Sequence, residues 1–123
     1  MMRVAQGMAA ALALLCLVTL AAYADPPPTI QALVQNPNRF DGKVVSVVGT
    51  ISAYRERASD TGHPFTVFVL SDGSTSVNVF IWNRHPFGNG DRVRVTGTFL
   101  RAKSVGTLTF DNEIQAHRIE MAP

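Results

Sequence analysis

Cysteine is nearly absent from this chain: Cys16 is the single one among 123 residues. It lies inside an apolar N-terminal segment that we expect to be removed, so the mature protein would contain no cysteine. That excludes disulfides, thiolate catalysis and cysteine-ligated metals together. A strong charge of one sign is also lacking, with 11 Lys and Arg against 9 Asp and Glu. This balance says little about partners, although a dedicated duplex-DNA binder usually carries a stronger basic bias.

Catalytic and metal-binding signatures are missing as well. The sequence holds no nucleophile elbow, no H-x-x-x-H, H-E-x-x-H or C-x-x-C spacing, and no Gly-rich phosphate loop between a strand and a helix. His63, His85 and His117 lie far apart in the sequence, and we interpret each as a solvated histidine. We therefore expect a protein that is not an enzyme and that needs no metal or cofactor.

The N-terminal segment has the pattern of a secretory signal peptide. Arg3 supplies a positive start, residues 8–22 form an almost unbroken apolar run, and Ala22-Tyr23-Ala24 fits the small-x-small cleavage pattern. A retained membrane anchor is the alternative, but the run is shorter than the ~20 residues that a comfortable span needs. We expect residues 1–24 to be cleaved after Ala24, leaving a periplasmic or secreted protein without an integral membrane segment.

What the sequence does contain is a repeated strand pattern. Residues 42–50 and residues 90–98 both read G-x-x-V-x-V-x-G-T. Valine and threonine at alternate positions are typical of a half-buried β-strand. A glycine inside such a strand, here Gly49 and Gly97, usually marks a bulge or a bend where a small barrel turns a corner. Two such strands in a chain this short predict a small closed barrel.

The rest of the chain predicts one short helix and three further strands. Thr29 is a suitable helix N-cap, residues 30–34 carry apolar side chains at helical spacing, and Pro37 ends the helix near Gln35. Strands are expected over residues 43–57, 65–70, 76–82, 92–103 and 107–119, the last interrupted near Asp111-Asn112. Residues 71–74, Ser-Asp-Gly-Ser, are a strong hairpin signal between the second and third strands.

Five strands with long, glycine-bent first and fourth members resemble the oligonucleotide/oligosaccharide-binding (OB) fold. The lead-in over residues 33–45, LVQNPNRFDGKVV, also resembles a group of small exported bacterial OB proteins. The expected fold is thus an all-β, five-stranded OB-fold barrel (43–119) with a leader and short N-terminal helix (25–42) and a short tail (120–123). Many OB domains place a helix between strands three and four, which the Pro- and Gly-containing link 83–91 can hardly form. We expect the N-terminal helix to cap the barrel instead.

The resemblance places the ligand face on the second and third strands, where aromatic rings stack on bases or sugars. If the valine faces of both strands fill the barrel, Phe68, Phe80 and Trp82 point outward and form that face. Alternatively, these rings lie under the helix or a loop as part of the core. Nearby arginines that could contact a charged backbone are Arg55, Arg57, Arg84 and Arg94. A solvated barrel surface is the competing interpretation of these arginines.

Two functions therefore stay open at this stage. The first is an exported, non-catalytic OB-fold protein that binds single-stranded nucleic acid or another oligomeric anionic ligand, with binding that weakens as salt rises. The second is a periplasmic envelope module that binds a protein or a peptide, through strand addition or through an aromatic patch. Export and the near-neutral charge favour the second, and analogy between folds favours the first.

Overall fold

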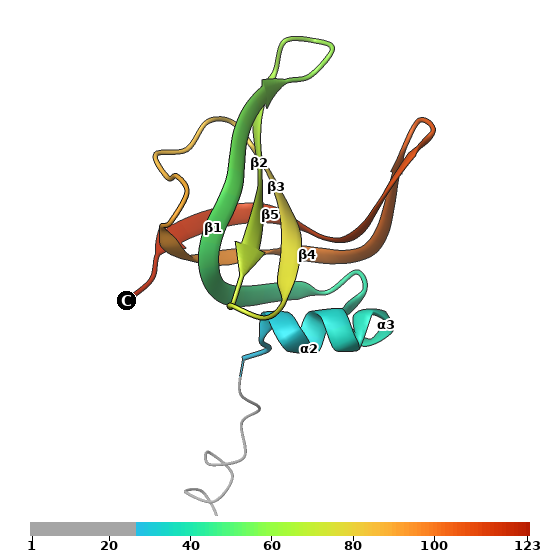
Figure 1. Cartoon of the computed structure of the whole chain (residues 1–123). Coiled ribbons are helices and arrows are strands. Elements are labelled where there is room, and N and C mark those ends of the chain that lie inside the picture. The colour runs from blue at the N-terminus through green and yellow to red at the C-terminus, as the bar shows by residue number, and fades with distance from the viewer. Residues whose placement is uncertain (1–26) are drawn as a thin grey trace, which may run out of the picture.

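The computed structural model describes residues 27–123, which form two short helices and five strands (Figure 1). The elements are α2 (Ile30–Gln35), α3 (Pro37–Phe40), β1 (Val44–Ala58), β2 (Pro64–Ser71), β3 (Ser76–Trp82), β4 (Arg92–Val105) and β5 (Leu108–Met121). The signal peptide expected over residues 1–24 lies outside the described residues. Within residues 27–123, no helix is long and apolar enough to cross a membrane. The predicted strands agree with the observed ones to within two residues at every end.

The five strands close into a barrel with the order β1-β2-β3-β5-β4. Strand β1 pairs with β4 from Val44 to Thr50 and with β2 from Thr50 to Ala58, so one long strand serves both halves of the barrel. Strands β3 and β5 pair in parallel, and the other neighbours are antiparallel. A closed five-stranded barrel in which β1 meets β4 is the OB-fold. The expected fold class is confirmed.

The two glycines of the repeated pattern lie where the barrel backbone is most crowded. A Cβ added at Gly49 would lie 2.8 Å from the Ser71 carbonyl oxygen and 2.9 Å from side-chain atoms of Ile30 and Leu70. At Gly97, an added Cβ would overlap the backbone of β5, where the register between β4 and β5 shifts by one residue. Both glycines are therefore needed for close backbone approach, as the sequence pattern predicts.

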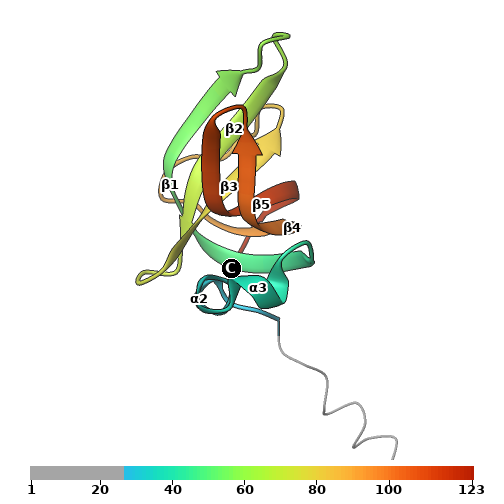
Figure 2. The same ribbon diagram turned by 90° about the vertical axis from the view of Figure 1, so that its right-hand side faces the viewer.

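Helix α2 covers one end of the barrel (Figure 2). Thr29 caps it, with its hydroxyl oxygen accepting a hydrogen bond of 3.1 Å from the Ala32 amide. Ile30 and Leu33 are fully buried and belong to the barrel core. The link between β3 and β4 contains no helix, so the N-terminal helix takes the capping position. Pro37 does more than end α2, because it also starts the one-turn helix α3, where proline at the first position is favoured.

A β-bulge in β1 decides which way its outer half faces. Before it, Val47 and Ile51 point into the core. The pairing with β2 then shifts between Ser52 and Arg55, and Ala53 has a left-handed backbone with φ of 51°. The extra residue reverses the alternation, because successive strand residues point to opposite faces. Tyr54 therefore packs against the core, and the following odd-numbered residues face outward.

The hairpin between β2 and β3 is closed by a side chain. The Asp72 carboxylate accepts hydrogen bonds from the backbone amides of Thr75 (2.9 Å) and Ser74 (3.2 Å) and from their hydroxyls. The Thr75 amide is the main cause of a lowered pKa for Asp72. A carboxylate with a lowered pKa stabilises the fold above its unfolded pKa, and this contribution is lost as the pH falls through the folded pKa.

The crowding at Gly97 gives a first prediction. We expect Gly97→Ala to lower the free energy of unfolding by about 3 kcal/mol, since its methyl group would overlap the backbone of Gln115 and Ala116. The control is Gly88→Ala, because a Cβ at Gly88 meets nothing within 4 Å. Urea unfolding followed by circular dichroism measures both, and equal stability of the two variants would contradict the close approach of β4 and β5.

Candidate functional site

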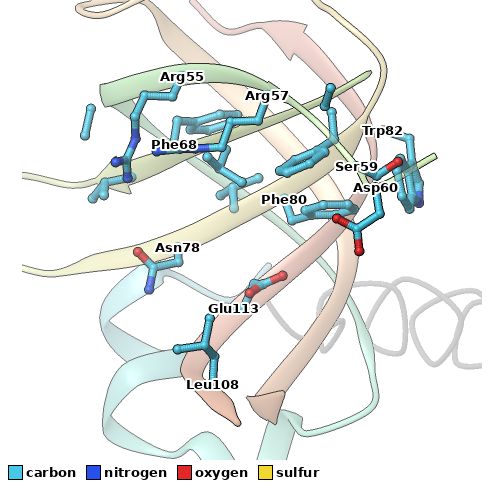
Figure 3. A pocket seen from close by; sticks show the side chains of 16 residues that line it. Arg55, Arg57, Ser59, Asp60, Phe68, Asn78, Phe80, Trp82, Leu108 and Glu113 are labelled. Atoms are coloured by element: carbon cyan, nitrogen blue, oxygen red, sulfur yellow. The ribbon is translucent and has the colours of Figure 1, made fainter. Parts of the chain in front are cut away.

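A cleft of about 890 Å³ lies on the outer face of β2 and β3. Its walls are the outer half of β1 with the loop that follows, on one side, and the start of β5 on the other. The β1–β2 and β4–β5 hairpins both project away from the helix-capped end of the barrel (Figure 1). Figure 3 shows the side chains that line the cleft. This is the face on which OB-folds bind oligonucleotides and oligosaccharides.

Three rings, Phe65, Phe80 and Trp82, form an aromatic triad along one side of the cleft. The ring centroids of Phe65 and Phe80 are 5.3 Å apart, and those of Phe80 and Trp82 are 5.0 Å apart in an edge-to-face arrangement. The ring of His63, from the β1–β2 loop, also meets the indole edge-to-face, with the ring centroids 5.6 Å apart. Trp82 nevertheless keeps 49% of its surface exposed. A large aromatic ring held in place and half open to solvent is suited to stacking against a flat ligand.

Two arginines of β1 lie on the same face as the triad. Arg55 and Arg57 both line the cleft and both are exposed (Figure 3). They follow the bulge in β1, and their cross-strand partners on β2 are Val67 and Phe65. Because paired residues of neighbouring strands point to the same face, the two guanidinium groups share the face of the aromatic triad. The bulge is what places them there, since an unbroken alternation would have aimed them at the core.

Among the described side chains, two carboxylates also line the cleft. Asp60 lines the cleft at its loop end, and Glu113 of β5 lines it at its floor (Figure 3). Glu113 is only 6% exposed, and its register partner on β3 is Asn78, which also lines the cleft. Across residues 27–123, no three His, Cys, Asp or Glu side chains gather as metal ligands would. The cleft thus combines aromatic rings, two cations, two carboxylates and an amide.

The expected orientation of β2 is wrong. Phe68 is 3% exposed, belongs to the core cluster and stacks on Tyr54 with a centroid distance of 6.2 Å. It reaches the cleft only as part of its floor. Thr66 on the same face is also buried. Its hydroxyl is satisfied there, because it donates a 2.8 Å hydrogen bond to the Asn83 carbonyl. Phe65 faces outward in place of Phe68. The alternative that the three predicted rings belong to the core therefore holds for Phe68, but not for Phe80 or Trp82.

Of the seven predicted site residues, the structure brings five to the cleft and leaves two outside it. Arg55, Arg57, Phe68, Phe80 and Trp82 line it, whereas Arg84 and Arg94 do not. Arg84 lies 3.7 Å from the carboxylate of Glu56, which alternates with the cleft arginines and so leaves β1 on the opposite face. Arg94 lies on β4. Its cross-strand partners are Val48 of β1 and Glu120 of β5, away from the β2–β3 face.

Sequence reasoning missed Phe65, Asn78 and Glu113 as site residues. The length of the β2–β3 turn could have predicted that Phe65 faces the cleft. Ser71 pairs with Ser76, so Leu70 faces the same way as Val77, and Phe65 faces the same way as Trp82. Glu113 gave no signal, because its position opposite Asn78 depends on the parallel pairing of β3 with β5, two strands that are far apart in sequence.

Comparison with known proteins supports the fold alone. No protein-family model and no curated protein sequence matches the chain. Among solved structures, the chain is similar to a Leishmania major protein assigned as an aspartyl-tRNA synthetase, with 18% identity and a TM-score of 0.61 over 80% of this chain. The match spans 21% of that longer protein. The chain is also similar to the second OB-fold domain of replication protein A from Methanococcus maripaludis, with 18% identity and a TM-score of 0.48. This match covers 66% of the present chain and 85% of that domain.

The buried position of Phe68 and the half-exposed position of Trp82 give a second prediction. We expect Phe68→Ala to lower the free energy of unfolding by about 3–5 kcal/mol, because it empties a core site. Trp82→Ala is expected to cost less than about 1 kcal/mol, since its ring is half exposed. Urea unfolding of both variants, followed by circular dichroism, measures the difference. Equal costs would place Phe68 outside the core.

Proposed function

We propose that this protein is a non-catalytic OB-fold protein that binds single-stranded nucleic acid in the cleft on β2 and β3. The observation that carries the proposal is the aromatic triad, whose Trp82 ring is half exposed and which shares one face of the barrel with Arg55 and Arg57. Successive bases would stack on the rings, and this contact tolerates any sequence because every base has a π-face. The guanidinium groups would contact phosphates, for which their planar donors are well suited.

The size and shape of the cleft support an extended ligand. It is bounded on two sides, by the outer half of β1 and by the start of β5, where Leu108 is exposed beside it (Figure 3). A groove between two hairpins admits a single strand whose bases are unstacked, whereas a duplex hides its base faces.

A peptide or protein segment is the second candidate ligand. The observation that favours it is the charge of the cleft, where Asp60 and Glu113 balance the two arginines. A groove lined by aromatic and aliphatic side chains with a few charges of both signs also suits an extended peptide. Binding of this kind would depend little on salt, which separates it from the first candidate.

Trp82 is the single tryptophan of the chain, so its fluorescence reports on the cleft directly. We expect a saturable change on titration with a single-stranded oligonucleotide at low salt. Two phosphate contacts predict that the logarithm of the binding constant falls with the logarithm of the salt concentration with a slope of about −1.4. Arg57→Ala should reduce that slope by about 0.7, whereas Phe80→Ala should weaken binding about tenfold and leave the slope unchanged.

The matched control is Arg84→Ala, which removes an exposed arginine outside the cleft and should change neither quantity. Absence of any change in Trp82 fluorescence at low salt, with Trp82 open to a soluble quencher, would reject nucleic acid as the ligand. A change produced by extended peptides that does not depend on salt would select the second candidate instead.

The same proposal includes export. Residues 1–24 have the pattern of a signal peptide, so a mature chain that begins at Asp25 is expected in the periplasm or the medium. Intact-mass measurement of the protein from a cell-envelope fraction checks this. Replacement of Ala22 and Ala24 by Leu should block cleavage, since the cleavage site requires small residues. A full-length protein in the cytoplasmic fraction would contradict export.

A further inference from the structure

The β1–β2 loop places a titratable ring against Trp82. His63 is exposed to solvent, and its ring meets the indole edge-to-face with the centroids 5.6 Å apart. Within residues 27–123, no hydrogen bond or ion pair engages the imidazole ring itself. Its two nitrogens are therefore accessible to water and to a ligand in the cleft, and the ring can gain a proton without breaking a contact.

The backbone of the loop determines the position of His63. The Ser59 amide donates a 2.8 Å hydrogen bond to the His63 carbonyl, and the His63 amide donates a 3.1 Å bond to the Ser59 hydroxyl. The Gly62 amide donates a 2.8 Å bond to the Ser59 carbonyl, which closes a β-turn. A turn closed by three hydrogen bonds holds its side chains in defined places, so the imidazole stays beside Trp82.

The charge of the loop depends on the protonation of His63. Residues 59–63 contain one other ionisable side chain, Asp60, which lines the cleft at the same end as Trp82 (Figure 3). The loop therefore carries one negative charge when His63 is neutral and no net charge when His63 is protonated. In the first state it repels a phosphate, and in the second it offers a cation to one.

Four further charged or titratable groups lie on the elements next to the loop. They are Glu56 and Arg57 at the end of β1, and Arg84 and His85 just after β3. Glu56 and Arg84 lie 3.7 Å apart and offset each other. The ring of His85 is hydrogen-bonded to the Trp82 carbonyl oxygen at 2.8 Å. Arg57 is thus the cation that accompanies Asp60 and His63 at this end of the cleft.

We infer that protonated His63 is a third cationic contact of the cleft, beside Arg55 and Arg57, and that single-strand binding is coupled to the uptake of a proton. The inference rests on the proposed function and adds its regulation by pH. A phosphate is joined to its base through one sugar, so a base stacked on Trp82 brings phosphates close to the ring that touches the indole. Histidine changes its charge between pH 5 and 8, and an imidazolium donates from both nitrogens. Because an anionic ligand favours the charged form, its affinity rises as the pH falls through this range.

The test compares the affinity for oligo(dT) without terminal phosphates at pH 6 and pH 8, measured by titration of Trp82 fluorescence. Neither thymine nor a phosphodiester gains a proton in this range, so any change belongs to the protein. We expect about threefold tighter binding at pH 6. The slope against the logarithm of the salt concentration should be steeper there by up to about 0.7. Calorimetry in buffers of different ionisation enthalpy should show that binding at pH 7 takes up a fraction of a proton.

Two substitutions separate the charge of His63 from its packing. His63→Gln should bind with the pH 8 affinity at both pH values and take up no proton. His63→Lys should bind tightly at both, because a lysine side chain stays charged throughout this range. The matched control is His117→Gln, which removes an exposed histidine of β5 outside the cleft and should keep the full pH dependence.

The outcomes distinguish this inference from the proposed function. Equal affinity and equal salt slopes at pH 6 and pH 8, without proton uptake, would overturn the role of His63 and leave the proposed function standing. A pH dependence that survives in His63→Gln would overturn it as well, since another group would then be titrating. If oligo(dT) binds at neither pH, the proposed function fails and this inference fails with it.

Discussion

The barrel depends on the bend in β1, because this strand pairs with β4 before the bend and with β2 after it. Gly49 lies at that point, and its missing side chain leaves space for the Ser71 carbonyl, for Ile30 of α2 and for Leu70 of β2. Barrel closure, the docking of the capping helix and the placement of the β2–β3 hairpin therefore meet at one backbone position. A short helix of this kind is unstable alone, so the burial of its apolar side chains at the bend is also what keeps it folded.

The candidate site depends on a second irregularity of the same strand. The bulge after Ser52 reverses the alternation of β1, so that Tyr54 joins the core and the next two arginines face the cleft. The left-handed backbone of Ala53 costs about 1–2 kcal/mol. Two hydrogen bonds to the β3–β4 link offset it, from the Tyr54 amide to the Asn89 side chain (2.9 Å) and from the Tyr54 hydroxyl to the His85 carbonyl (2.8 Å). The link that replaces the usual helix thus holds the bulge in place.

The sequence reveals most of the fold because its signals are local. The repeated glycine strands, the Thr29 cap and the turn at residues 71–74 each depend on neighbouring residues, and each matches the structure. The facing of β2 could not be predicted from composition, because both of its faces are apolar and the polar Thr66 is buried through a hydrogen bond. The bulge in β1 and the pairing of Asn78 with Glu113 are products of tertiary contacts. Arg84 illustrates the same limit, because Trp82, two residues before it, lines the cleft while the ion pair of Arg84 with Glu56 lies outside the cleft.

The balance of charge in the cleft constrains how a nucleic-acid ligand would be held. Oppositely charged groups at short range largely cancel each other's field beyond about 10 Å, so the cleft would attract a strand from a distance only weakly. Affinity would then come mainly from stacking, at about 1–3 kcal/mol for each base on the aromatic triad. The carboxylates would reduce the phosphate attraction further, which is a cost to a protein that must bind any sequence.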